Sequence, residues 1–133
     1  MRKLYLVLIV GTVLPFQTYA QSIDSYLSKE YSRCIDASGG NTANMLDCNE
    51  AELKRWDQRL NAVYKKVMTA LEKERAAALK DAQKKWISFR NSSVTFYNDP
   101  NGGTMSRLSA SSVFLRMTVE RTLELEDILR SES

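Results

Sequence analysis

One stretch of the chain, residues 48–71, most strongly limits what the protein can fold into. Its apolar residues recur at gaps that alternate between three and four, which is the spacing of one helical face and does not fit a β-strand. These residues are Leu53, Trp56, Leu60, Val63, Val67 and Leu71, with Tyr64 and Met68 beside them. A helix with such a face must be covered by partners of similar shape, so the stretch predicts a helical core.

Two later segments supply such partners. The third segment shows the same alternation at Leu79, Ala82, Trp86, Phe89, Ser93 and Phe96, and the last segment at Leu108, Ser112, Leu115, Thr118, Thr122, Leu125 and Leu129. Residues 21–33 carry a weaker helical spacing. We expect breaks near residues 71–76 and at residues 98–103, with Thr42 and Thr104 as N-caps. The sequence therefore predicts an all-α protein: an antiparallel bundle of three long helices plus a short N-terminal helix.

The first twenty residues have the features of a signal peptide. Arg2 and Lys3 precede an apolar run from Leu4 to Phe16, and the third and first positions before Gln21 then carry the small side chains of Thr18 and Ala20. A membrane-spanning anchor is the alternative, but a bilayer needs about 20 apolar residues and this run is shorter. We expect cleavage after Ala20, one helical domain over residues 21–133, a periplasmic or secreted location, and no stable membrane anchor after cleavage.

The two cysteines, Cys34 and Cys48, are expected to form a disulfide, because export places them where disulfides persist. A metal site and a redox pair are the alternatives. The chain has no histidine and two thiols make a poor zinc shell, so no metal is expected. Redox pairs are more often spaced Cys-x-x-Cys.

Charge and motifs exclude several functions. Without Arg2 and Lys3 the chain has 17 basic and 16 acidic residues, so it lacks the basic footprint of a nucleic-acid-binding protein. Phosphate-binding and nucleophile motifs are missing, and no cofactor is expected. The acid pairs Glu50–Asp57 and Glu124–Asp127 are compatible with a glycosidase, but they alternate with basic residues as on a salt-bridged helix surface. We therefore expect no enzyme activity.

Basic residues cluster between the second and third segments and offer contact with an anionic partner, or simply form solvated helix faces. They are Lys65, Lys66, Lys73, Arg75, Lys80, Lys84 and Lys85.

Two groups of residues are candidates for partner contact. The first is a polar cluster next to the apolar faces: Trp56, Asp57, Asn61, Gln83, Trp86 and Arg90. An Asp57–Arg90 ion pair there would set the register of two helices, or the cluster would form a binding spot beside two tryptophans. The second is a loop whose glycines let a partner approach the backbone closely, or that merely connects two helices: Asn101, Gly102, Gly103, Thr104 and Arg107.

A family resemblance rests on residues spread over most of the chain. They are Cys48, Glu50, Trp56, Asp57, Leu60, Asn61, Tyr64, Ala82, Gln83, Trp86, Arg90, Gly102, Gly103, Thr118 and Arg121. This pattern resembles the LprI-like family of small secreted bacterial proteins. The resemblance implies a disulfide-stabilised helical bundle that inhibits lysozyme-type muramidases. Family members usually carry a second cysteine pair, which is absent here near Ser93 and near Ser112 or Val113.

Together these features lead to two functional hypotheses. The first is a secreted periplasmic protein that binds and inhibits a lysozyme-type peptidoglycan muramidase, either a host lysozyme or a rival's toxin. The second is a non-catalytic structural or adaptor protein that binds another envelope component.

Overall fold

All regular structure in the described part of the chain is helical. The computed structural model describes residues 22–132, which contain a 3₁₀ helix η1 (Ile23–Tyr26) and four α-helices, α1 (Lys29–Ala37), α2 (Thr42–Ala70), α3 (Lys73–Tyr97) and α4 (Gly103–Ser131). The all-α prediction, with three long helices and a short leading one, is confirmed. The predicted signal peptide lies outside the described residues. Among those described, no helix is long and apolar enough to cross a membrane.

The ends of α2 follow from local chemistry. The Asn41 side chain accepts a hydrogen bond from the backbone N–H of Asn44 and so caps the helix. The predicted cap, Thr42, is instead the first helical residue. The break predicted near residues 71–76 lies at Leu71 and Glu72, where extended backbone separates α2 from α3.

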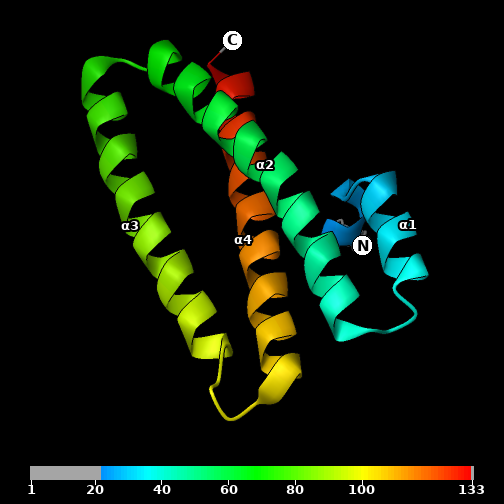
Figure 1. The fold of residues 1–133 in the computed structure, drawn as a ribbon. Coiled ribbons are helices and arrows are strands. Elements are labelled where there is room, and N and C mark those ends of the chain that lie inside the picture. Colours follow the sequence, from blue (N-terminus) through cyan, green and yellow to red (C-terminus); the bar gives the residue numbers. More distant parts are fainter. Residues whose placement is uncertain (1–21, 133) are drawn as a thin grey trace, which may run out of the picture.

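The three long helices run up, down and up (Figure 1). Cross-helix hydrogen bonds show the directions: Asn49 of α2 bonds to Ser112 of α4, and further along both helices Arg59 pairs with Glu126. Thus α2 and α4 are parallel, and α3 is antiparallel to both. Each long helix is therefore antiparallel to the one before it along the chain, as in the predicted antiparallel bundle.

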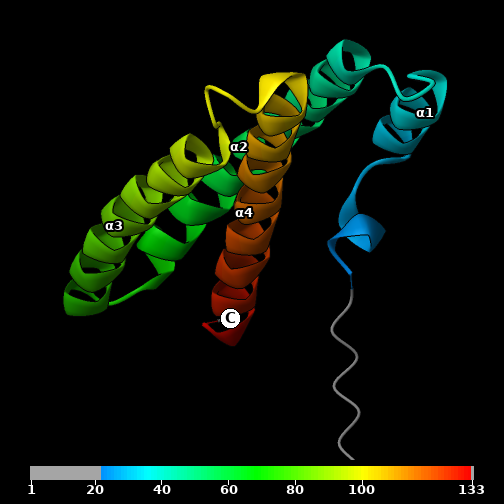
Figure 2. The same ribbon diagram turned by 90° about the horizontal axis from the view of Figure 1, so that it is seen from below.

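The helices do not form an evenly closed bundle. α2 and α3 are joined at one end and diverge toward the other, while α4 lies between them (Figures 1 and 2). The main seam is therefore between α2 and α4. Two groups of buried residues make up its apolar core, and they are Leu60, Val63, Val67 and Leu125 in one, and Trp56, Leu115 and Val119 in the other.

The apolar face predicted on α3 is only half right. Leu79 and Trp86 pack against the core, but Phe89 and Phe96 are 65% and 79% exposed. Gln83 is buried in their place, together with Arg90. The buried face is displaced by one residue, or about 100° around the helix, from the exposed aromatic residues. The three-four spacing of apolar residues thus combined two adjacent faces of α3, an exposed one and a buried one, into a single predicted face.

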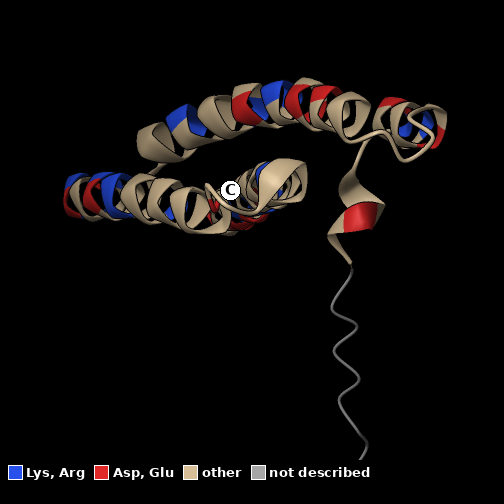
Figure 3. Cartoon of the chain, turned by 60° about the horizontal axis from the view of Figure 1, so that its bottom comes forward, with Lys and Arg blue, Asp and Glu red and all other residues tan. Residues whose placement is uncertain are grey.

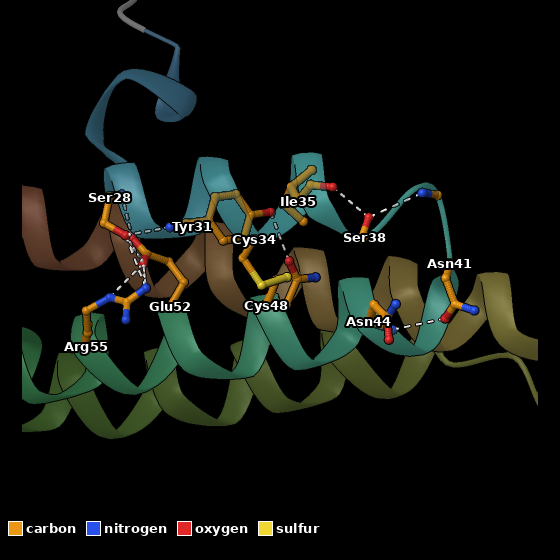
Figure 4. Close-up of a disulfide and its surroundings, with 12 residues drawn as sticks. Ser28, Tyr31, Cys34, Ile35, Ser38, Asn41, Asn44, Cys48, Glu52 and Arg55 are labelled. Carbon is orange, nitrogen blue, oxygen red and sulfur yellow. Dashed lines mark hydrogen bonds and ion pairs between the residues drawn. A yellow bond between two sulfur atoms is a disulfide. The ribbon is translucent and has the colours of Figure 1, made fainter.

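Three interactions attach the N-terminal segment to α2 (Figure 4): a disulfide, the contacts of Glu52, and a hydrogen bond that the Tyr31 hydroxyl donates to the Asn49 side-chain carbonyl at 2.9 Å. The predicted disulfide joins Cys34 of α1 to Cys48 of α2. Glu52, 1% exposed, lies one turn beyond Cys48 and accepts hydrogen bonds from the Ser28 backbone N–H (2.9 Å), the Ser28 hydroxyl (2.7 Å) and Trp56 Nε1 (3.0 Å). Arg55 completes the shell as an ion-pair partner. Since Ser28 is the N-cap of α1, Glu52 holds the start of that helix.

Burial on its own raises the pKa of the Glu52 carboxyl, but the hydrogen bonds from Ser28, Arg55 and Trp56 lower it by more. The net pKa therefore lies below the ordinary value for glutamate. The carboxylate stays ionised in the folded protein at neutral pH.

We expect the double substitution Cys34→Ser/Cys48→Ser to reduce the free energy of unfolding by about 3 kcal/mol, because it frees a loop of about 15 residues in the unfolded chain. The melting temperature, followed by circular dichroism, will fall by roughly 10–20 °C with helix content largely kept. Equal melting temperatures with and without reductant would contradict this.

Glu52→Gln will destabilise the protein at pH 7 by about 1.5–3 kcal/mol, because the neutral amide loses charge-assisted hydrogen bonds. The folded pKa of Glu52 is lowered, so its stabilising contribution is present above the unfolded pKa of about 4.3 and is lost as the pH falls through the folded value. Urea unfolding between pH 7 and pH 3 will therefore show the gap between wild type and variant closing in acid. A gap independent of pH would refute the assignment.

Candidate functional site

The structure divides the predicted polar cluster between two parts of the molecule. Trp56 is buried with Leu115 and Val119, and its ring carries the Arg59 guanidinium at 4.6 Å. Trp86 instead packs against the other group of core residues. A single binding spot beside both tryptophans is not formed.

Asp57 and Asn61 lie exposed on α2. The Asn61 side-chain amide donates to the backbone carbonyl of Asp57 (2.8 Å) and to its carboxylate (3.2 Å). Among the described residues the predicted Asp57–Arg90 pair is not an ion pair, since Arg90 is directed to α4. Asp57 acts on it only at longer range: burial lowers the pKa of the Arg90 guanidinium, and the Asp57 charge opposes that decrease.

Gln83, Trp86 and Arg90 come together on the face of α3 that packs on α4. The Arg90 guanidinium lies between two rings, 4.8 Å from the centre of Trp86 and 4.4 Å from that of Phe114. Its Nη1 is 3.4 Å from the Thr118 hydroxyl, and no hydrogen-bond partner contacts its buried Nε. Aromatic faces thus supply most of its electrostatic partners.

A second arginine, Arg121 of α4, lies beside this stack. Its Nε donates to the Gln83 side-chain carbonyl at 2.9 Å, and its Nη1 pairs with Glu124 at 2.7 Å. Its guanidinium lies 5.8 Å from the centre of the Trp86 ring. The two buried arginines and Gln83 fix the register of α3 against α4, so this half of the cluster has a structural role.

The predicted contact loop lies at one end of the molecule, between α3 and α4 (Figure 1), and Asn101, Gly102, Gly103, Thr104 and Arg107 are all exposed. Asp99 folds the loop: its carboxylate accepts the Asn101 N–H (2.8 Å), and its carbonyl accepts the Gly102 N–H (3.0 Å) and the Ser106 hydroxyl (2.7 Å). The amides of Asn101 and Gly102 are therefore already used within the loop.

Both loop glycines have structural reasons to be glycine. A Cβ on Gly102 would lie 2.6 Å from the Ser106 Cβ, and Gly103 has a φ of +62°. Gly102 rather than Thr104 is the N-cap of α4, and it offers no side-chain cap. The first N–H groups of α4 consequently face outward from the positive end of a long helix.

The predicted acid pairs differ in their surroundings. Glu50 and Asp57 line a shallow groove of about 330 Å³ with Lys54 and Phe114. Glu124 is held by Arg121, and Asp127 pairs with Arg130. Over residues 22–132, no group of histidine, cysteine and acidic side chains could hold a metal ion.

The sequence did not indicate two features of this region. The burial of Glu52 follows from its long-range contact with Ser28, which no local pattern in the sequence indicates. The exposure of Phe89 and Phe96 was hidden within a predicted apolar face. The sequence indication of the true buried face was the pair Gln83 and Arg90. These polar residues directly follow Ala82 and Phe89, and they make the polar contacts to α4.

These features define a small helical protein in which a disulfide joins two helices and buried polar groups hold α3 against α4. The residues of the α3–α4 loop are exposed at one end of the molecule. The chain belongs to the LprI family: the family model described as "Lysozyme inhibitor LprI" matches residues 34–125, more than half of its length. The match runs from the first disulfide cysteine to the core residue Leu125, and it confirms the resemblance. At the level of the family, this membership implies lysozyme inhibition. No curated protein and no solved structure matches the chain significantly.

The structural role of the arginine pair leads to a contrast between two substitutions. Arg121→Met will lower the free energy of unfolding by about 1–3 kcal/mol, because it leaves the buried Gln83 carbonyl without its donor. Arg90→Met will leave stability unchanged or raise it, because a flexible apolar chain fills the space between two rings without the cost of burying a charge. Urea unfolding of both variants provides the measurement, and equal losses would contradict the contrast.

Proposed function

We propose that this protein is exported from the bacterial cytoplasm, and that outside the cytoplasm it binds and inhibits a lysozyme-type muramidase. Family membership supports the target class. The disulfide supports an oxidising compartment, where such bonds persist. The predicted signal peptide agrees with export.

The observation that carries the proposal is the end of the molecule formed by the α3–α4 loop. There the first turn of α4 offers outward N–H groups, and Arg107 adds an exposed cation. A muramidase cleaves its polymer with two carboxyl groups across an open cleft. Donors and a cation placed over those carboxyl groups would satisfy them while the rest of the contact excludes substrate and water.

The biological target has two forms, which the lysozyme class distinguishes. A protein that defends against a host will inhibit animal-type lysozymes, whereas an immunity protein will inhibit the wall-degrading toxin of a competing bacterium. The same surface chemistry serves both, because both enzymes present catalytic carboxyl groups.

A different function, as an adaptor within the envelope, is favoured by one feature of α2. Lys65 and Lys66 line an open groove of about 410 Å³ with Thr69 and Ala70. This groove would hold an anionic envelope component. The Trp56 and Trp86 rings do not serve this role, because both are packed in the core.

In a cell-wall clearing assay with several lysozyme classes, the wild-type protein will inhibit at least one class at near-stoichiometric concentration. Arg107→Glu will weaken that inhibition at least about tenfold, which corresponds to about 1.4 kcal/mol. It reverses a charge at the contact and leaves an exposed helix position otherwise intact. Thr104→Ala and Asn101→Ala test the loop without disturbing the two glycines.

Lys66→Glu provides the matched control, since it makes the same charge change on the exposed face of α2. It will leave inhibition unchanged. A loss with Lys66→Glu but not with Arg107→Glu would transfer the contact to the α2 groove. An absence of inhibition against every class would refute the proposed function.

A further inference from the structure

The two cysteines of the disulfide differ in how far solvent can reach them. Cys34 is an exposed residue of α1, a helix in which none of the nine residues is buried. Cys48 of α2 is only 1% exposed. Figure 4 shows the bond that joins them from one helix to the other. A thiol that approaches the folded protein from outside can therefore reach Cys34 but not Cys48.

A shallow hollow of about 280 Å³ lies beside the disulfide. Besides the two cysteines it is lined by Ala37, Ser38, Asn44 and Asp47. All of these side chains are short, so the hollow leaves room next to the bond for the thiol group of a second molecule. α1 itself carries two basic and two acidic residues (Figure 3), and its charge therefore does not exclude a charged thiol.

Contacts on both sides of the disulfide hold α1 against α2 without its help. Before Cys34 in the chain, the Tyr31 hydroxyl donates to the Asn49 side-chain carbonyl at 2.9 Å. After it, the Asn41 N–H donates to the Ser38 carbonyl at 3.0 Å and closes the turn between the helices. The two thiols of the reduced protein consequently stay adjacent. One of them can attack a group held on the other at high effective concentration.

We infer that thiol–disulfide exchange with the folded protein takes place at Cys34, and that Cys48 is the resolving cysteine. The co-reactant is a thiol of another molecule, either a small thiol or the reactive dithiol of an oxidoreductase. This inference does not depend on the inhibition of a muramidase.

Opening of the bond begins when an external thiolate attacks Cys34 Sγ and forms a mixed disulfide there. The bond to Cys48 breaks, its electron pair leaves on Cys48 Sγ, and this thiolate takes a proton from water. A second external thiolate then attacks the external sulfur of the mixed disulfide and releases Cys34, which is also protonated. Two external thiols are thereby oxidised to one disulfide, and the protein disulfide is reduced to two thiols.

Re-formation of the bond in the folded protein follows the same path in reverse. The Cys34 thiolate attacks the disulfide of an oxidised partner, which gives the mixed disulfide and a partner thiolate. The Cys48 thiolate then attacks Cys34 Sγ and displaces the partner's sulfur. Because Cys48 is shielded from outside, its thiol reacts with its neighbour rather than with a partner.

A different path would run through unfolding of the chain. In an unfolded chain Cys34 and Cys48 are both accessible, so neither sulfur would be preferred. The ratio of products at the two cysteines therefore distinguishes exchange with the folded protein from exchange after unfolding.

The first test uses the wild-type protein with its disulfide intact. The protein is treated briefly with 2-mercaptoethanol and quenched in acid, free thiols are blocked with N-ethylmaleimide, and the adducts are located by mass spectrometry. The 2-mercaptoethanol adduct on Cys34 will exceed that on Cys48 at least about tenfold, because access decides which sulfur is attacked. The same treatment in urea that unfolds the chain is the control, and it will give comparable amounts on both.

The second test compares Cys48→Ala, which leaves Cys34 as the single thiol, with Cys34→Ala, which leaves Cys48. Ellman's reagent will react at least about tenfold faster with the thiol of Cys34 in the folded proteins and at comparable rates in urea. An oxidoreductase that lacks its own resolving cysteine will be trapped as a covalent complex with Cys48→Ala only. Exchange with small thiols but no such complex would limit the co-reactant to small thiols.

Equal adducts on the two cysteines of the folded wild-type protein, or an excess on Cys48, would overturn the inference. That result needs no substitution, so it stands even where a single-cysteine variant fails to fold. Inhibition of a lysozyme is measured separately in the clearing assay, and either result can fail without the other.

Discussion

The fold depends on the seam between α2 and α4, two helices that run in the same direction. Val67 of α2 and Val119 and Leu125 of α4 are completely buried there. Two threonines, Thr118 and Thr122, are fully buried there, and the hydroxyl of each donates a hydrogen bond to the backbone carbonyl one turn earlier in the helix. Their polar groups are thus satisfied without help from α2, and their small size lets the helices approach closely. The other elements are attached to this seam: α3 by its arginine contacts to α4, and α1 by the disulfide and Glu52.

How well the sequence predicted each helix depended on whether its polar and apolar residues separate cleanly. On α2 the positions of Leu60, Val63 and Val67 marked one face, and the structure buries them. On α3 the buried face contains Gln83 and Arg90, which a rule based on apolar residues rejects. Their burial is stable only because α4 supplies Arg121, Thr118 and Phe114 as partners. That information lies 24 to 38 residues away in the chain and is absent from the local pattern.

The candidate site was predictable only in part for the same reason. The loop between α3 and α4 was visible as a break, because proline and glycine interrupt a helix. The sequence did not indicate that the Gly102 N–H bonds to the Asp99 carbonyl within the loop. The exposed rings of Phe89 and Phe96 could not be told from core residues by spacing alone, since both are apolar and recur at the same three-four spacing as buried residues do. Exposure is a property of the neighbours, and the divergence of α2 from α3 determines it.

The parallel course of α2 and α4 also has a consequence for how the protein assembles. Contacts across the seam join residues 63 and 67 positions apart, such as Asn49 with Ser112 and Arg59 with Glu126. A polypeptide that leaves a translocation channel N-terminus first therefore cannot cover the apolar side of α2 until its last quarter has emerged. The disulfide loop, in contrast, spans only 14 positions and can close early. In a chain exported in this way, oxidation of the two cysteines would precede the packing of α2 against α4, and the apolar face of α2 would stay uncovered until α4 has emerged.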